Sequence, residues 1–379
     1  MTLGLEKLYT FLDEYTDFEQ ILYGAWDNYR DHVTHSMRVM LLGDSIIRSA
    51  FKFENVATAP ESGLVVSPDE KEAMWVIMAL THDLGLPLEA IRRISDRVRK
   101  MLYEFGMVSV EELTSGYFSQ YANLSDFVIR FVSSNVMKRK DQENREEEER
   151  GKKTGKNTDE YVLHVQAKYY QKFLSALSSF NHGVVSSIIL MKDLVFFKES
   201  EFMIDDFKLL DGDDARQFLI RNQILRAIAS HSCEDIYHLT IANFPFILTV
   251  CDEMQEWGRP RLVDVTKRAG SVPVLLINKV SNKVVDYTIR FSFPSGVPTS
   301  EEEKKRVSSE IALYFEKKSK KWLNVLRSAV SPNRDIELRF AVEDETYSPF
   351  KKYALRHRNP ENVDIEPSDM KDKIMTGPA

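Results

Sequence analysis

Residues 79–90 read ALTHDLGLPLEA, and in this stretch an adjacent His82–Asp83 pair follows an apolar run that begins at Trp75. An ionised carboxylate is costly where a helix enters its core, unless a partner compensates it. A metal ion is a common strong partner for a histidine and an aspartate together. The alternative is a helix C-terminus at which both side chains face water, and an isolated two-residue match favours that alternative. Only other residues of the chain can separate these two interpretations.

The composition is that of a soluble globular protein. With 379 residues, 43% of them hydrophobic and 29% charged, the chain is long enough for two or three domains. No apolar run approaches the roughly 20 residues that a membrane span needs, and the acidic N-terminal stretch does not resemble a signal peptide. Two cysteines, Cys233 and Cys251, make no disulfide framework. We therefore expect a cytoplasmic protein with no membrane partner.

Charge is distributed unevenly along the chain. Residues 1–258 carry 28 Lys and Arg against 41 Asp and Glu, whereas residues 259–379 carry 23 against 17. The basic C-terminal part, with KKSKKW at residues 317–322, would suit nucleic acid, but a solvated lysine-rich helix face explains it equally well. We expect this part to form a homo-oligomer contact or to pack on the rest of the chain rather than to bind nucleic acid.

The first 258 residues have mainly helical periodicity, with apolar residues three and four positions apart. Ser67-Pro68-Asp69-Glu70 has the capping hydroxyl, the proline and the acids of a helix start, and this helix ends at the His82–Asp83 pair. Further helices are predicted over 6–23, 32–51, 88–106, 109–137, 159–180, 182–198, 213–231 and 243–257. Residues 138–160 contain no large apolar residue, so we predict a charged insertion there, with a charged surface helix as the alternative.

The pattern changes after Pro260. Residues 272–280 and 286–295 have the pattern of strands joined by a short turn, a helix follows from Ser300 to about 329, and residues 336–344 are predicted as another strand. The predicted fold is a mainly α core over 1–258 and a small α+β (β-β-α-β) C-terminal domain over 259–357. Residues 358–379 are expected to form a flexible tail.

Further histidines and an aspartate stand in or at the ends of apolar helices, and these are His35, His182, His231 and Asp252. Each is weak taken singly, because a lone histidine is more often a satisfied core residue and a buried aspartate can cap a helix. Together with the pair at 82–83 they supply six nitrogen or oxygen ligands on separate helices. Six ligands can hold two divalent ions if Asp83 bridges them, and a set without thiolate suits iron, manganese or zinc.

The order of these residues resembles the HD-domain superfamily of metal-dependent phosphohydrolases. The resembling stretches are HVTHSMRV at 32–39, THDLG at 81–85 and CDEMQEW at 251–257. The family's minimal site corresponds to His35, His82, Asp83 and Asp252. The two histidines that two-metal members add correspond to His182 in NHGVVSSIIL and His231 in AIASHS. The resemblance covers residues 25–260 and implies nothing about the C-terminal domain.

Three departures from the family leave the substrate open. The cyclic-dinucleotide branch resembles HDxGK, but Leu86 stands in the place of the lysine. That branch also has a histidine pair and a GYP element, whereas here Ser232 follows His231 and no such element occurs. The triphosphohydrolase branch tends to have polar residues after HDLG, where this chain has LPLEA.

Candidate substrate contacts lie close to these ligands. His32 is three residues before His35 and could be the first ligand or a substrate contact, although the HSxxV context favours His35 as the ligand. Arg92 and Arg93, one turn beyond the HDLG stretch, are candidate phosphate contacts. The alternative for both arginines is an exposed basic helix face.

The resemblance implies a metal-dependent phosphohydrolase or phosphodiesterase. Asp83 and His82 would form its catalytic centre, with two divalent ions per chain that activate a hydroxide, iron or manganese in preference to zinc or magnesium. The expected substrate is a phosphorylated small molecule such as a nucleotide. Relatives with a six-ligand site also resemble di-iron oxygenases, which cleave C–C or C–P bonds with dioxygen. A third hypothesis is a non-catalytic module that senses a nucleotide.

Overall fold

The computed structural model describes residues 2–25, 30–58, 62–103, 122–139, 160–193, 209–236, 240–259, 271–326, 336–359 and 362–375. The chain divides into two compact units. Unit 1 consists of Met1–Lys7 and Val56–Cys233, and unit 2 consists of Leu8–Asn55 and Glu234–Ala379. The sequence predicts a single boundary at 258–259, whereas the units assign most of the first 55 residues to the same unit as the C-terminal sheet.

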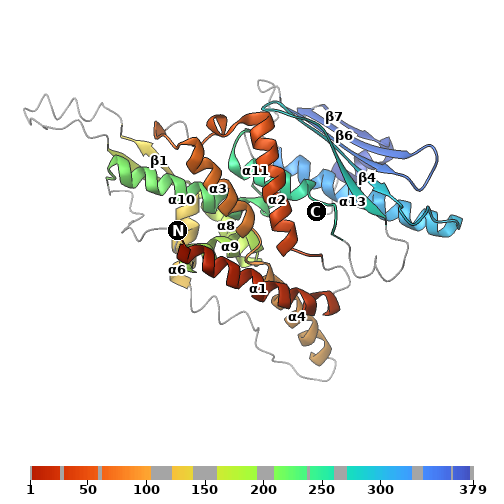
Figure 1. Cartoon of the computed structure of the whole chain (residues 1–379), viewed down its shortest axis with the longest axis horizontal. Helices are drawn as coiled ribbons and strands as arrows, with labels where there is room; N and C mark the ends of the chain where they lie inside the picture. Colours follow the sequence, from red (N-terminus) through yellow and green to blue (C-terminus); the bar gives the residue numbers. More distant parts are fainter. Residues whose placement is uncertain are drawn as a thin grey trace, which may run out of the picture. The chain divides into compact units, whose positions relative to one another are not determined.

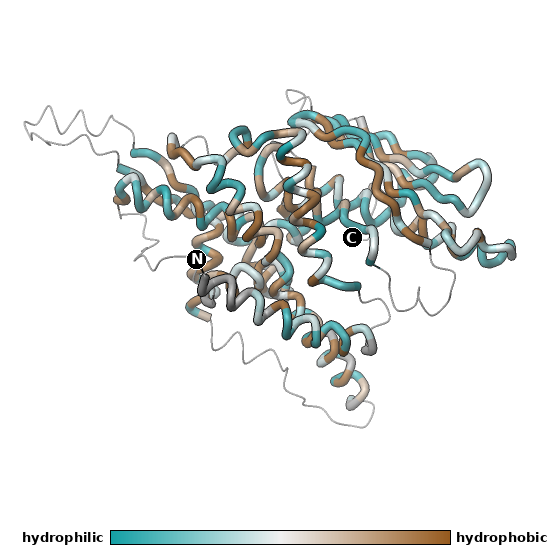
Figure 2. The backbone as a smooth tube through the Cα atoms, in the orientation of Figure 1, coloured by the Kyte–Doolittle hydropathy of each residue, from teal (hydrophilic) through white to brown (hydrophobic). Residues whose placement is uncertain are grey.

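Unit 1 is a set of helices with one short hairpin (Figure 1). Its elements are α3 (Pro68–Thr81), α4 (Leu86–Tyr103), α6 (Ala122–Ser133), β1 (Ser134–Lys138), β2 (Tyr161–Val165), α8 (Ala167–Ser178), α9 (His182–Asp193) and α10 (Gly212–His231). Helix α10 packs against α9, α3 and α6 and is buried along most of its length. Some of its buried side chains are polar, and Asn222 donates hydrogen bonds to the carbonyl oxygens of Phe131 and Ser134. Figure 2 shows hydrophilic and hydrophobic residues interspersed along the helices of this unit.

The predicted helix start at Ser67 is confirmed as a full capping box. The Ser67 hydroxyl accepts a hydrogen bond from the Glu70 amide, and the Glu70 carboxylate accepts one from the Ser67 amide. Two backbone N–H groups that the helix leaves without partners are thereby satisfied. The helix therefore begins at a fixed residue, which in turn fixes where its other end delivers His82 and Asp83.

Two helices predicted in unit 1 are wrong in part. The predicted helix over 109–137 is helical from Ala122 to Ser133 and continues as strand β1, and the one over 159–180 begins with strand β2. The two strands pair antiparallel, and Val136 and Leu163 are buried partners in that pairing. Alternate burial along a short segment cannot be told from helical periodicity by sequence alone. Most of the charged insertion predicted over 138–160 lies outside the described residues.

Unit 2 combines helices with a five-stranded sheet. Helix α1 (Thr2–Ala25) begins in unit 1 and belongs to unit 2 from Leu8 onward. The other elements are α2 (Val33–Ile46), the π-helical turn η1 (Ile47–Phe51), η2 (Phe53–Asn55), α11 (Phe244–Met254), β3 (Val272–Val280), β4 (Val284–Ser292), α13 (Glu301–Val325), β5 (Glu337–Asp344), β6 (Lys351–Asn359), β7 (Asn362–Glu366), η4 (Ser368–Met370) and α14 (Lys371–Met375). The strand order is β3-β4-β5-β6-β7, with β4 and β5 parallel and the other neighbours antiparallel.

The predicted succession of two strands, a helix and a strand is confirmed, and two more strands follow it. The expected flexible tail over 358–379 is wrong for residues 362–375, because they form β7, η4 and α14. In β7 the side chains of Val363 and Ile365 are buried while Asp364 is exposed. This alternation is that of an edge strand with one face on a core. The chain therefore has a helical part and a separate small sheet region.

Helix α13 lies against the sheet and forms its core with it (Figure 1). Phe315 is fully buried, with its ring stacked on Phe340 of β5 and on Tyr353 of β6 at centroid distances of 5.6 and 5.7 Å. The buried indole of Trp322, two turns further on, donates a hydrogen bond of 2.6 Å to the Tyr287 hydroxyl. Aromatic residues thus hold the helix to three strands.

Residues 68–101, over α3 and α4, form the only described stretch that by itself has the length and apolar composition of a membrane span. Of its most apolar window, 56% is buried inside the structure. Helices α8 and α9 pass the same test only as a pair, across a bend of 101°. Core helices of soluble proteins pass this test too, so the finding is only a weak indication of a membrane span.

We predict that Phe315→Ala lowers the free energy of unfolding of this chain by about 3–5 kcal/mol, because it leaves a cavity under the sheet. Leu313→Ala on the same helix is the control, since Leu313 is 51% exposed, and we expect a change within about 0.5 kcal/mol. Urea denaturation followed by circular dichroism measures both. Equal effects of the two variants would contradict the assignment of this core.

Candidate metal centre

His82 and Asp83 lie in the four-residue turn that joins α3 to α4 in unit 1. His82 is 0% and Asp83 5% exposed, so neither side chain faces water. His182 is the first residue of α9 and His231 is the last residue of α10. All four side chains therefore lie at or next to helix ends, and these ends come close to one another in unit 1. A solvated helix C-terminus is therefore excluded for the pair at 82–83.

The Asp83 carboxylate lies among three histidine Nε2 atoms. Its Oδ1 is 3.4 Å from His182 Nε2 and 3.7 Å from His231 Nε2, whereas its Oδ2 is 3.5 Å from His82 Nε2. The ligand atoms of Asp83, His182 and His231 all lie within 4.8 Å of one another and could hold a metal ion. The two oxygens of Asp83 thus face different histidines, as a bridging carboxylate between two ions would require.

Each of these histidines uses its Nδ1 for a hydrogen bond. His82 Nδ1 is 2.8 Å from the carbonyl oxygen of Ala79, and His231 Nδ1 is 2.6 Å from that of Ile228. A carbonyl oxygen can only accept, so both rings carry a proton on Nδ1, and in the neutral form of each ring the lone pair is then on Nε2. A histidine needs this tautomer to bind a metal through Nε2.

Glu89 orients the third histidine and was not identified from the sequence. Its Oε2 is 2.8 Å from His182 Nδ1, and it lies in the first turn of α4, six residues after Asp83. Carboxylate–histidine pairs of this kind fix the ring and increase its basicity as a ligand. No spacing rule connects Glu89 to His182, 93 residues away, so only the packing of α4 on α9 reveals the pair.

The close approach of the turn to α9 depends on Gly85. A Cβ atom there would lie 2.4 Å from the carbonyl oxygen of His182. The Gly85 amide donates to the Ser186 hydroxyl at 2.8 Å, and that hydroxyl donates to the carbonyl oxygen of His82 at 2.7 Å. The glycine of THDLG and a serine of α9 therefore hold the turn in place beside His182.

Unit 2 contains the other two predicted ligands, His35 of α2 and Asp252 of α11. His35 Nε2 is 2.9 Å from Asp252 Oδ1, and the ring is buried. His35 Nδ1 lies 2.5 Å from Gln255 Oε1, and Gln255 Nε2 donates to the carbonyl oxygen of Trp257 at 2.8 Å. The second bond identifies the Gln255 oxygen as the acceptor, so His35 also has its proton on Nδ1.

His35 contacts Asp252, and His32 lies close to His35. His32 is the N-cap residue of α2, and its amide donates to the Glu19 carboxylate at 2.5 Å. Its Nδ1 is 3.3 Å from Nη2 of Arg259. The two rings of His32 and His35 meet edge to face, with centroids 5.9 Å apart. His32 is therefore a neighbour of the His35–Asp252 pair, and which of the two histidines is a ligand stays a prediction.

The two arginines proposed as phosphate contacts lie on α4. The guanidinium carbon of Arg92 is 5.0 Å from the ring centroid of Phe180, which follows α8. This contact gives Arg92 a packing role between α4 and the turn before α9. The side chain of Arg93 lies outside the described residues.

A buried ionic cluster follows Asp252 in unit 2 and was also not identified from the sequence. Lys318 Nζ lies 2.5 Å from Glu253 Oε2 and 2.8 Å from Glu256 Oε1, and Lys321 Nζ also contacts Glu253. Arg30 Nη2 is 2.5 Å from Glu256 Oε2. Two lysines of the basic KKSKKW stretch are therefore engaged in ion pairs inside the unit.

Burial by itself would raise the pKa of Glu256, but Lys318 and Arg30 outweigh it and hold that pKa at about 2. For Lys318 burial would lower the pKa, yet the Glu253 and Glu256 carboxylates raise it well above its usual range. Both groups are charged at neutral pH as a consequence, so the cluster is an ion-pair network and not a set of neutral hydrogen bonds.

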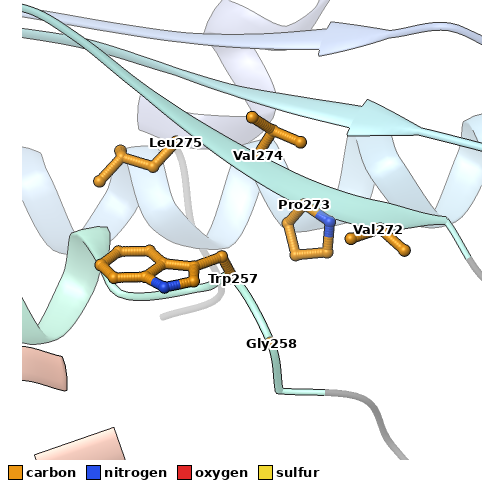
Figure 3. Close-up of a pocket in the computed structure, with 6 residues that line it drawn as sticks. All are labelled: Trp257, Gly258, Val272, Pro273, Val274 and Leu275. Carbon is orange, nitrogen blue, oxygen red and sulfur yellow. The ribbon is translucent and has the colours of Figure 1, made fainter. Parts of the chain in front are cut away.

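An apolar pocket of about 480 Å³ lies between Trp257 and Gly258, which follow Glu256 in the sequence, and strand β3 (Figure 3). Its lining residues are Trp257, Gly258, Val272, Pro273, Val274 and Leu275. Figure 3 shows the indole of Trp257 facing the part of β3 that carries Pro273 and Leu275. Trp257, whose carbonyl oxygen accepts the hydrogen bond from Gln255, therefore faces β3, an edge strand of the sheet.

The chain matches no protein-family model, no curated protein and no solved structure. The fold and the site describe a mainly helical chain with a small sheet region. It contains a group of buried histidine and aspartate side chains that could hold a metal ion.

We predict that His182→Ala lowers the metal content of the purified chain to roughly half or less, because the ligand atoms of His182, His231 and Asp83 lie close enough together to hold one metal ion. His164→Ala is the matched control, since His164 is an exposed histidine of β2 in the same unit. Mass spectrometry of elements on untagged protein purified without chelator gives the content. A His182→Ala chain that retains the full metal content would make His182 an ordinary core histidine.

We predict that Glu256 contributes to the free energy of unfolding at neutral pH and that this contribution is lost in acid. Its folded pKa of about 2 lies below the unfolded value of roughly 4.3, so its ion pairs stabilise the fold above about pH 4.5 and the stabilisation is lost as the pH falls towards 2. Between pH 6 and pH 3 the wild type should lose about 2 kcal/mol that Glu256→Gln does not lose. Urea unfolding at the two pH values measures this. Glu302→Gln, at an exposed position of α13, should keep the wild-type pH dependence.

Proposed function

We propose that this chain is a metal-dependent phosphohydrolase or phosphodiesterase of the HD type. The observation that carries the proposal is the position of the Asp83 carboxylate, with its two oxygens directed to different histidine Nε2 atoms. A buried carboxylate surrounded by three imidazole nitrogens suits divalent ions of the iron, manganese and zinc type. The resemblance of the HVTHSMRV, THDLG and CDEMQEW stretches to the HD superfamily supports the same activity.

We further propose that His35 and Asp252 complete a six-ligand set with His82, Asp83, His182 and His231. The order of the six in the sequence supports this assignment, as does the fact that His35 has the same tautomer as the ligands of unit 1. Such a set would hold two divalent ions per chain, with iron or manganese preferred over zinc or magnesium.

The chain's own residues would prepare the site in two ways. Ala79, Ile228 and Glu89 hold the histidine Nδ1 protons, so the Nε2 lone pairs are available without a change of tautomer. Burial of His82 and Asp83 excludes bulk water, which strengthens every charge interaction there. Bound divalent ions would lower the pKa of a water molecule and polarise a phosphoryl oxygen. A phosphorylated small molecule such as a nucleotide is the substrate class this chemistry fits.

We predict that the manganese- or iron-loaded protein releases p-nitrophenol from p-nitrophenyl phosphate or bis(p-nitrophenyl) phosphate. Asp83→Asn should lower kcat at least 1000-fold, because an amide cannot bridge two cations as a carboxylate does. Glu89→Gln should lower kcat about 10- to 100-fold through weaker orientation of His182. His164→Ala should keep the wild-type rate.

Two outcomes of this assay would overturn the proposal. In the first, the metal-loaded protein has no phosphatase activity, but its near-ultraviolet absorption responds to reductant and dioxygen. The chain would then be a di-iron oxygenase. Protein with neither property, whose melting temperature rises with a nucleotide, would make it a binding module.

A further inference from the structure

The end of helix α11 is held by two lysines of α13. Lys318 Nζ donates to the main-chain carbonyl oxygen of Glu253 at 3.0 Å as well as to its carboxylate. Lys321 donates to the other carboxylate oxygen of Glu253. A helix leaves its last carbonyl groups without intrahelical partners, and a lysine ammonium there satisfies one of them and opposes the negative end of the dipole. We call Lys318, Lys321, Glu253 and Glu256 the lysine clamp.

The residues that contact His35 are next to the clamp residues in the sequence. Asp252 directly precedes Glu253, and Gln255 lies between Glu253 and Glu256. Asp252 meets Nε2 of His35 and Gln255 meets its Nδ1, so both ring nitrogens depend on the same five-residue segment. A displacement of this segment by a fraction of an ångström would change both contacts at once.

The clamp is built from largely buried charges. The side chains of Glu253 and Glu256 are 8% exposed and that of Lys318 is 15% exposed. Buried ion pairs add little net stability, but they have a strong directional preference, and removal of one partner leaves an unpaired charge. The contact of Lys318 with the carbonyl oxygen of Glu253 ties the lysine directly to the backbone of the last turn of α11.

From this arrangement we infer that Lys318 and Lys321 are positioning residues for the metal ligands His35 and Asp252, and that α13 with its sheet is therefore a necessary part of the metal centre. The inference rests on the proposed assignment of His35 and Asp252 as ligands. It gives the C-terminal α+β region, to which the sequence resemblance assigns nothing, a role in the same site.

The test measures Mn²⁺ binding to the full chain by isothermal titration calorimetry. Lys318→Met and Lys321→Met should weaken the binding of at least one ion about tenfold or more, and Lys318→Arg should restore part of the loss. Lys317→Met is the matched control, because Lys317 is an exposed neighbour on the same helix, and its binding should equal that of the wild type. Phe315→Leu controls for stability, since it weakens the core of α13 without touching the clamp.

A second measurement separates this inference from the proposed function. Long-range ¹H–¹⁵N spectra of histidine-labelled, metal-free protein report the tautomer of each ring, and His35 should have its proton on Nδ1 in the wild type. In Lys318→Met or Lys321→Met, we expect the His35 signals to move or broaden while those of His82 and His231 stay unchanged. This result would support the positioning role even if no phosphatase activity were found.

The inference is overturned if the Lys318→Met and Lys321→Met chains bind Mn²⁺ as the wild type does and keep the His35 spectrum. It is overturned as well if Phe315→Leu, at an equal loss of melting temperature, weakens Mn²⁺ binding as much as they do. If Lys318→Met does not fold, Lys321→Met and Lys318→Arg answer the same question, because Lys321→Met keeps Lys318 against Glu253 and Lys318→Arg keeps a cation at both positions.

Discussion

The buried carboxylate of Asp83 is the constraint on which unit 1 depends. A carboxylate with 5% exposure stays ionised only where cations, a metal ion or strong donors surround it. A metal ion held by the neighbouring histidine Nε2 atoms would meet that requirement. The unit brings the ends of four helices to one place, with His182 at the start of α9, His231 at the end of α10 and the turn at 82–85 between α3 and α4. The capping box at Ser67 and the close contact at Gly85 determine where these ends lie.

Unit 2 solves a similar problem with fixed charges of its own. Glu253 and Glu256 are as deeply buried as Asp83, and the lysines of α13 together with Arg30 compensate them. The basic stretch that gives the C-terminal part its positive charge is thus partly an internal counterion. The two units differ in one respect that bears on function. The acids of unit 2 have cationic partners within the chain, whereas Asp83 is surrounded by imidazoles that are themselves metal ligands when neutral.

Because no comparison identifies a relative, the functional argument depends on the donor set and its hydrogen bonds. A two-ion hydrolytic site uses nitrogen and oxygen donors without thiolate, histidine rings whose Nδ1 is held by a fixed acceptor, and a carboxylate that faces different rings. The site in unit 1 has all three features. The same donor set also suits a di-iron oxygenase, and for that reason the metal and its redox behaviour are the properties that discriminate between these activities.

The sequence by itself determined which residues would be unusual. The His82–Asp83 pair follows an apolar run, His182 begins one apolar helix, His231 ends another, and residues 272–280 form an apolar strand. Local sequence patterns are sufficient to identify all of these features. Only the tertiary structure decided which groups meet. It joined Glu89 to His182, Gln255 to His35 and Lys318 to Glu253, and it turned part of two predicted helices into the β1–β2 hairpin. Partners of this kind are 65 to 220 residues apart, and their contact depends on packing between elements, to which no local pattern responds.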